Sequence, residues 1–307
     1  MATVIAAERY LALDLGAESG RAVVGTFDGD HLAMAEVHRF PNRPVRLPTA
    51  VHWDVLSLLA EVRDGIATAE RGGPLASLAV DAWGVDFGLL DARGALLSNA
   101  VHYRDPRTDG MLDAAFAVVP REEIFAQTGI QFLPINTLYQ LLALVRADDP
   151  SLRVAVTLLT IPDLLNYWMS GEKACEFTNA TTTQCFNPLT RTWAGDLLQR
   201  LGIPQHVFPQ VLPPGTTLGS LRDEAGAAHA TRVVLPGSHD TASAVAGTPL
   251  RDADAAYISS GTWFLVGVEI PEPAITPQTL ALNLTNEGGV GSTFRLLRNV
   301  MGLWLVQ

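Results

Sequence analysis

The order of strands and helices near the N-terminus restricts the fold more than any other feature of the sequence. Alternating or β-branched residues predict three consecutive strands, at residues 10–15, 21–27 and 31–40. Asp28-Gly29-Asp30 before the third strand is a hairpin turn signal. Apolar spacing predicts a helix over residues 53–71, and short apolar runs predict strands at 78–82 and 86–91. This order predicts an α/β fold with a mixed sheet.

The middle of the chain alternates helical patterns with a buried strand. Periodicity predicts helices at residues 138–146 and 162–169, the second one ended by Gly171, and a strand between them at 154–160. Residues 204–219 are rich in Pro and Gly, and we predict a loop rather than a domain linker. The next elements in order are a strand, a connection and a helix of small residues, predicted at 231–235, 237–241 and 242–247.

A second strand system follows, with strands predicted at residues 257–260, 263–269 and 294–299. Gly261-Thr262 and Glu287-Gly288-Gly289 are predicted connections, and residues 301–307 predict the start of a helix. So few strands cannot bury a core of their own. We therefore expect a complete first domain, residues 1–247, and a truncated second domain, residues 248–307.

The composition limits the classes of partner and the compartment. The formal net charge of −11 argues against a nucleic-acid-binding protein, because such proteins concentrate Lys and Arg. Cys175 and Cys185 lack a CxxC spacing, which favours two reduced thiols. Glu8 and Arg9 stand where a signal peptide needs an apolar core, and no uncharged apolar run is long enough to span a bilayer. We expect a cytoplasmic protein that binds neither nucleic acid nor membrane.

Two glycine-containing turns are candidates for phosphate binding. The segment 14–21 joins the first two strands, and backbone N–H groups in such a turn can hold phosphate oxygens. Asp14, at the end of the preceding strand, can hold Mg²⁺ through water; the alternative is a plain hairpin with an Asp in the turn. Ser259-Ser260-Gly261-Thr262 repeats the arrangement in the second strand system. Together the two turns resemble the actin-like ATPase fold, in which two ribonuclease-H-like domains clamp a nucleotide.

Gly237-Ser238-His239-Asp240-Thr241 lies between a buried strand and a helix. An acid at the end of a strand and beside a helix N-terminus faces the crevice of an open α/β sheet. Asp240 is therefore a candidate general base that accepts the proton of a sugar hydroxyl during phosphoryl transfer. The alternative is that Asp240 is only the N-cap of the helix, a position that Asp favours.

The chain as a whole resembles the FGGY family of carbohydrate kinases. The similar stretches occur in the family's order and cover almost the whole chain, at residues 14–21, 80–87, 103–105, 128–134, 136–140, 178–184, 238–245, 259–263, 286–289 and 299–305. The resemblance implies a ribonuclease-H-like sugar-kinase fold. It also implies that residues 1–247 are the sugar-binding domain and that residues 248–307 begin a nucleotide-binding domain whose remainder lies beyond this sequence. A fragment and a shortened gene would both give such a chain.

On the nucleotide side, the resemblance implies contacts to ATP from Thr262, Gln307 and the first-domain loop formed by Ala17, Glu18, Ser19, Gly20 and Arg21. It implies that Asp14 supports Mg²⁺ through water. On the sugar side, Gly84 would contact the substrate through its backbone, while His239, Thr241 and Asn299 would bind its hydroxyls. Asp240 would bind the substrate and act as the catalytic base.

The implied activity is ATP-dependent phosphorylation of a ketose at C1. The stretches are most similar to family members acting on L-rhamnulose, which would give L-rhamnulose 1-phosphate; L-fuculose and L-xylulose are alternatives. A different class of function is a catalytically inactive sugar-binding fragment. For these 307 residues alone we expect weak MgATP binding, negligible turnover and self-association through residues after Ala255.

Other conspicuous residues have plainer interpretations. We expect Trp83 and Phe87 to be core residues rather than platforms for a sugar ring. The run 178–183 is predicted to be a polar strand or loop that could line the sugar cleft. His52, His102 and His206 show no metal-ligand spacing, so no metal other than Mg²⁺ is expected.

Overall fold

The computed structural model describes residues 7–252 and 254–303. Its main element is a six-stranded mixed sheet in the order β13-β14-β6-β1-β2-β3. The first hairpin joins β1 (Glu8–Leu15) to β2 (Ser19–Phe27), and β3 (Leu32–Pro41) extends it antiparallel. β6 (Ser77–Ala82) runs parallel to β1, and β14 (Ala228–Val234) runs parallel to β6. The predicted mixed α/β sheet is confirmed.

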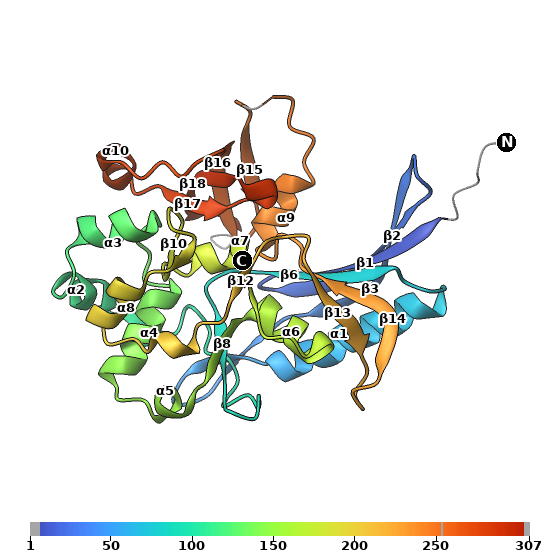
Figure 1. Ribbon diagram of the computed structural model, residues 1–307, viewed down its shortest axis with the longest axis horizontal. Coiled ribbons are helices and arrows are strands. Elements are labelled where there is room, and N and C mark those ends of the chain that lie inside the picture. Colours follow the sequence, from blue (N-terminus) through green and yellow to red (C-terminus); the bar gives the residue numbers. More distant parts are fainter. Residues whose placement is uncertain (1–6, 253, 304–307) are drawn as a thin grey trace.

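Helices α1 (Val55–Arg71) and α6 (Ile161–Ser170) pack against this sheet and share its core (Figure 1). The predicted start of α1 at residue 53 is two residues early, because Trp53 belongs to the short strand β5 (Val51–Trp53), which pairs with β4 (Pro44–Arg46). The side chain of Asp54 caps the helix by accepting a hydrogen bond from the N–H of Ser57. Gly171 ends α6 in the left-handed conformation, as predicted.

A second apolar core lies in the helical region at the left of Figure 1. It is built mainly by α2 (Met111–Phe116), α3 (Arg121–Thr128), α4 (Thr137–Arg146) and α8 (Gly195–Arg200). The two-stranded sheet of β7 (Phe87–Leu90) and β8 (Thr157–Thr160) connects this region to the first core.

Three predictions for the middle of the chain are wrong. The strand predicted at 154–160 begins only at Thr157, because Asp149 caps and Pro150 starts a short helix, α5 (Pro150–Val154). The run 178–183 is neither strand nor loop, because most of it forms the buried helix α7 (Phe177–Thr182). The side chain of Glu176 accepts hydrogen bonds from the first N–H groups of this helix. The proline-rich segment 204–219 is not only a loop.

Three elements interrupt that segment: a 3₁₀ turn at Gln205–Val207, β12 (Val211–Leu212) and the start of β13 (Thr217–Arg222). β12 pairs with β9 (Cys175–Glu176), and β13 is the edge strand of the main sheet. The remaining short pair is formed by β10 (Phe186–Asn187) and β11 (Thr192–Trp193). Cys175 and Cys185 are both buried and free.

The second strand system is a four-stranded antiparallel sheet in the order β15-β16-β18-β17. β15 (Ala256–Ser260), β16 (Trp263–Ile270) and β18 (Phe294–Met301) were predicted, but β17 (Thr285–Gly288) was taken for a connection. Met301 is in a strand rather than a helix, and residues 304–307 of the predicted helix lie outside the described residues. The short helix α10 (Pro277–Ala281) lies between β16 and β17.

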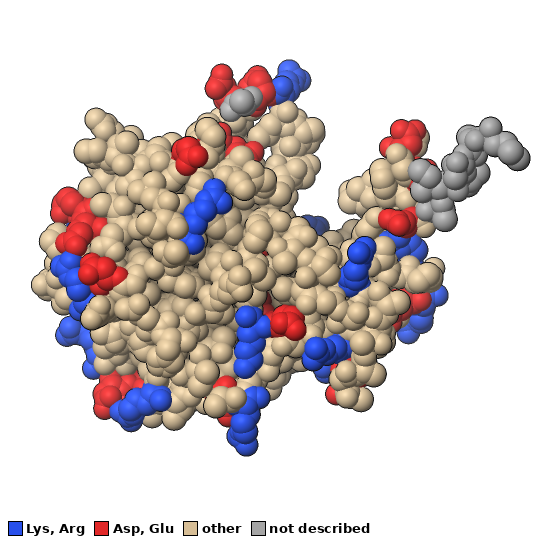
Figure 2. Space-filling model, viewed as in Figure 1, with Lys and Arg blue, Asp and Glu red and all other residues tan. Residues whose placement is uncertain are grey.

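Figure 1 shows the second sheet above the first, with α9 (Asp240–Ala246) packed against β15. On the face shown in Figure 2, Lys and Arg side chains are interspersed with Asp and Glu and form no continuous basic stripe. Within residues 7–252 and 254–303, no helix has the length and apolar character needed to cross a membrane.

Candidate functional site

A cavity of about 480 Å³ opens between the two sheets. Its walls include the β1–β2 hairpin, the turn after β6, the N-terminus of α9, the β15–β16 turn and part of β17 and β18. Most of the site residues predicted from the sequence line it: Asp14, Ala17, Glu18, Ser19, Arg21, Gly84, His239, Asp240, Thr241, Thr262 and Asn299. Segments more than two hundred residues apart in the sequence therefore meet at one cavity.

Two predicted site residues are not in the cavity wall. Gly20 lies behind it, where an added Cβ would overlap the ring of Phe40. Glycine is therefore needed here for packing against β3. Gln307 lies outside the described residues.

The β1–β2 hairpin is a tight turn in which the N–H of Gly16 donates to the carbonyl of Ser19 at 2.9 Å. Asp14 and Arg21 face each other across the two strands, with Arg21 Nη2 2.6 Å from Asp14 Oδ2. Both side chains are partly exposed toward the cavity, so the ion pair is screened and can open. The turn thus offers a cation and backbone N–H groups to an anionic ligand.

Asp81, on β6 directly beside Asp14, was not predicted as a site residue. Burial raises its pKa well above the usual range, and the charges of Asp14 and Asp240 raise it further. Three carboxyl groups therefore converge at this end of the sheet. Among the described residues, however, no group of three or more His, Cys, Asp or Glu side chains is arranged to hold a metal ion directly.

Gly84 and Val85 form a strained turn after β6. A Cβ on Gly84 would lie 2.8 Å from Thr182 Oγ1 of α7, so a side chain there would displace the helix or the turn. Val85 has φ of 69°, a costly conformation for a β-branched residue, of the order of 1–3 kcal/mol. Its N–H donates to Thr182 Oγ1, and its carbonyl accepts from Thr137 Oγ1 at 2.6 Å. Strain held by its surroundings in this way is typical of ligand-binding turns.

Asp240 is the first residue of α9, and the N-cap position belongs to His239, so the interpretation of Asp240 as an N-cap is wrong. Its Oδ1 accepts the N–H of Thr241 at 2.5 Å and lies 3.4 Å from His239 Nε2. The side chain keeps 37% of its surface exposed, at the cavity wall. Desolvation by the surrounding protein raises its pKa, although His239 and the Thr241 hydrogen bonds oppose the rise. The geometry suits a carboxylate that accepts a proton from a bound hydroxyl.

A buried carboxylate fixes the backbone just before Asp240. Glu176 Oε2 accepts hydrogen bonds from Ser238 N at 3.0 Å and Ser238 Oγ at 2.8 Å, while its Oε1 accepts from Thr178 N at 2.9 Å. Thr178 Oγ1 in turn accepts the N–H of His239. Glu176 thereby connects α7 to the start of α9. Sequence reasoning missed it, and the only signal was an isolated acid before the Thr-rich run.

The opposite wall carries the β15–β16 turn and Trp263, while Trp83 and Tyr103 line the cavity from the first core. Ser259, Ser260, Gly261 and Thr262 all line the cavity, and the N–H of Gly261 donates to the carbonyl of Trp263. Trp83, predicted to be a core residue, is buried in the first core and also lines the cavity. Phe87 is buried and belongs to the second core, as predicted.

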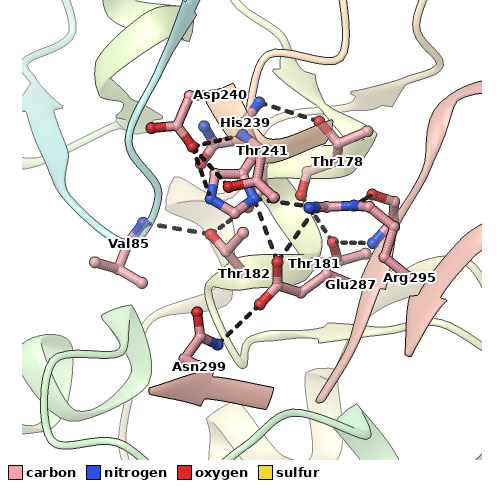
Figure 3. A network of polar contacts seen from close by, with 12 residues as sticks. Val85, Thr178, Thr181, Thr182, His239, Asp240, Thr241, Glu287, Arg295 and Asn299 are labelled. Carbon is pink, nitrogen blue, oxygen red and sulfur yellow. Dashed lines mark hydrogen bonds and ion pairs between the residues drawn. The ribbon is translucent and has the colours of Figure 1, made fainter. Parts of the chain in front are cut away.

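Glu287, Arg295 and Asn299 bring the second sheet into contact with α9 (Figure 3). Glu287 lies on β17 and the other two on β18. Glu287 Oε2 is 3.3 Å from His239 Nδ1 and 3.2 Å from Arg295 Nη2. Only Asn299 of these three was predicted as a site residue. Glu287 was taken for part of a connection, and Arg295 lay in a predicted strand without a signal that pointed to the site.

Comparison with known proteins gives a consistent result. Residues 9–247 match the family model described as the FGGY family of carbohydrate kinases, N-terminal domain. A rhamnulokinase of Pectobacterium atrosepticum is 44% identical over 306 residues, which are 99% of this chain and 61% of that protein. A rhamnulokinase of Oceanobacillus iheyensis is 43% identical over 97% of this chain and 64% of its own length. The chain thus spans less than two thirds of the curated relatives that it matches.

Solved structures show the same fold at low sequence identity. A ligand-bound xylulose kinase from Lactobacillus acidophilus superposes with a TM-score of 0.82 at 19% identity, over 94% of this chain and 59% of that one. A gluconate kinase from the same organism gives 0.83 at 18% identity, over 96% of this chain and 60% of that one. At such identities the likeness shows the fold alone.

Proposed function

Because the chain belongs to the FGGY family of carbohydrate kinases, we propose that its cavity binds a ketose and ATP and that it phosphorylates the ketose at C1. L-Rhamnulose is the proposed substrate and L-rhamnulose 1-phosphate the product, since the relatives at 43–44% identity carry the name rhamnulokinase. The observation that carries the proposal is the position of Asp240. It stands at the start of α9 with part of its carboxylate exposed in the cavity wall, which it shares with the hairpin that offers Arg21.

We assign residue roles on this basis. Asp240 would accept the proton of the attacking hydroxyl, and the backbone of Gly84 together with His239, Thr241 and Asn299 would orient the sugar. Residues 17–19, Arg21 and Thr262 would face the phosphates of ATP from the two sides of the cavity. Mg²⁺ would be held through water near Asp14, where it would neutralise charge on the transferring phosphoryl group. We place the boundary between the sugar-binding and nucleotide-binding parts at residue 247.

The test is a coupled assay of ADP release with MgATP and a panel of L-rhamnulose, L-fuculose, L-xylulose, D-xylulose and glycerol, run on a protein in which residues 1–307 are followed by the remainder of the nucleotide-binding domain. We expect kcat/KM to be highest for L-rhamnulose. The polar groups of the site would be arranged to match its hydroxyls, so that an epimer would leave one buried polar group of the protein without a hydrogen-bond partner. A clear preference for another ketose would support the kinase activity but contradict L-rhamnulose as the substrate. Ketose binding without turnover would favour the second class of function, a sugar-binding chain without catalysis.

Self-association through the second sheet stays a prediction. Ile258 and Val266, on neighbouring strands, are 64% and 42% exposed, and an exposed apolar edge strand invites pairing with a second chain. Light scattering over a concentration series would test it; a monomer at all concentrations would contradict it.

A further inference from the structure

Glu287 is a charged residue in an unusual position. It lies on β17, only 4% exposed, yet it forms part of the cavity wall. A carboxylate is rarely buried to this extent unless it is paired or serves a ligand. The partners of Glu287 show how much of its hydrogen-bonding capacity is already used.

Oε2 carries most of the contacts, from Arg295 Nη2 at 3.2 Å and from the ring of His239 at 3.3 Å (Figure 3). Among the described residues, Oε1 has one partner, Asn299 Nδ2, at the long distance of 3.4 Å. An ionised carboxylate can accept about four hydrogen bonds. Oε1 therefore keeps the capacity to accept from a donor in the cavity.

Arg295 holds this carboxylate in place. Its side chain is fully buried, its Nε donates to the carbonyl of Gly288 at 2.9 Å, and its Nη2 contacts both Glu287 and His239 Nδ1. Burial raises the pKa of Glu287, but the hydrogen bond with His239 and the charge of Arg295 outweigh it and lower the pKa overall. The group is thus an ionised, oriented acceptor.

The same carboxylate touches two residues proposed to bind the sugar, one from each side of the cavity. His239 precedes α9, and Asn299 lies on β18, where Gln131 also holds its backbone N–H at 2.9 Å. A hydroxyl placed between His239 and Asn299 would lie beside Oε1. Sugar hydroxyls are donors, and a hydrogen bond to a charged acceptor in a shielded site is stronger than one between neutral groups.

We infer that Glu287 is a substrate-binding residue that accepts a hydrogen bond from one ketose hydroxyl and, held by Arg295, fixes the positions of His239 and Asn299. The inference rests on the proposed function, because it takes the ligand of the cavity to be a ketose. It makes Glu287 a determinant of selectivity: a sugar lacking that hydroxyl leaves a buried carboxylate oxygen unpaired.

The test is calorimetric titration of wild type and Glu287→Gln with L-rhamnulose, with each monodeoxy analogue and, separately, with MgATP. We expect Glu287→Gln to weaken L-rhamnulose binding roughly 10- to 100-fold, the range for losing a hydrogen bond to a charged group. MgATP binding should change less than about twofold. Against one monodeoxy analogue the two proteins should bind alike, because the hydroxyl that Glu287 accepts is absent.

Glu269→Gln is the matched control. Glu269 is a carboxylate on β16 of the same sheet that accepts from Thr293 Oγ1, and it is not among the cavity-lining residues. It should leave ketose affinity unchanged. If Glu287→Gln fails to fold, Glu287→Asp keeps the charge beside Arg295, shortens the reach toward the sugar and should give the same pattern of losses.

Three results would overturn the inference. If Glu287→Gln binds L-rhamnulose with the affinity of the wild type, Glu287 does not bind the sugar. An equal loss against every deoxy analogue would leave it as a positioning residue only. Failure of the wild-type chain to bind any ketose would remove the proposed function together with this inference, and it is distinguished because it precedes any mutation.

Discussion

The two sheets that border the cavity hold their site residues in different ways. In the six-stranded sheet the apolar side chains of β1 and β6 are buried in a core shared with α1 and α6, and backbone hydrogen bonds position the turns that reach the cavity. The four-stranded sheet shares a small core with Val245 of α9 and exposes Ile258 and Val266. It reaches the cavity through the β15–β16 turn and the side chains of Glu287 and Asn299, with the buried Arg295 holding Glu287 from behind. Substitutions of site residues on the first side should therefore alter catalysis and stability, and substitutions of the polar site residues on the second should alter sugar affinity with little effect on stability.

The largest effect is expected at Asp240. Asp240→Asn keeps the shape but cannot accept the proton, so kcat should fall roughly 10²–10⁴-fold, the usual contribution of a positioned general base. Sugar affinity should change much less, since the amide retains some hydrogen bonding. Steady-state kinetics with L-rhamnulose check this in any preparation of the chain that turns over. Turnover equal to wild type would exclude Asp240 as the base.

Adding one methyl group in each half compares the two sides directly. Gly84→Ala places a Cβ 2.8 Å from Thr182 Oγ1, whereas at Gly261 the nearest atom, the carbonyl oxygen of Trp263, is 3.8 Å away. Gly84→Ala should lower the free energy of unfolding by about 1–3 kcal/mol, the range for overpacking, and weaken sugar binding. Gly261→Ala should fold as wild type. Chemical denaturation measures both variants, and equal stabilities would show that the Gly84 turn is not confined by α7.

Buried carboxylates on the two sides should respond oppositely to pH. Burial raises the pKa of Asp163 to about 7, although a hydrogen bond from Thr160 opposes the rise. The native state then holds a proton that the unfolded chain has released, so stability is lost as the pH rises from about 4 to about 7, by at most about 1.4 kcal/mol per pH unit. Glu287, with its lowered pKa, contributes no such loss in that window.

Asp163→Asn should flatten this dependence, because the amide mimics the protonated acid at every pH. Urea unfolding of wild type and Asp163→Asn at pH 5, 6 and 7 measures it, with Glu269→Gln as a control on the other sheet. Parallel curves for wild type and Asp163→Asn would show that Asp163 titrates normally.

The sequence was informative wherever a local pattern determines the structure. The first three strands, α1, α4, α6 and three strands of the second sheet follow from periodicity and turn residues. Most predicted site residues meet at one cavity because nearly all lie at the end of a strand, in the turn that follows it or at the start of a helix, where chain direction sets their position.

Other elements depend on contacts between residues that lie far apart in the sequence, and local patterns do not reveal such contacts. The run 178–183 is polar, yet most of it forms a buried helix, in which Glu176 caps the first N–H groups and the same carboxylate accepts from Ser238. β17 contains Asn286, Glu287 and two flanking small residues, and it becomes a strand through pairing with β18. Asp81 lies in a predicted apolar strand and gave no sign of a role in the site. Only the pairing of β6 with β1 places it beside Asp14.

The smallest effect is expected on the outer face of the second sheet. Ile258→Lys replaces a side chain that is 64% exposed on the edge strand β15, so the free energy of unfolding should change by less than about 0.5 kcal/mol. Leu265→Ala, one strand away but in the core of the same sheet, is the control and should cost about 2–5 kcal/mol. Thermal unfolding compares the two, and light scattering of Ile258→Lys tests self-association, which an edge Lys should reduce. A large loss of stability in Ile258→Lys would mean that the outer face of this sheet is covered in solution, and the contrast between the two sheets would then not hold.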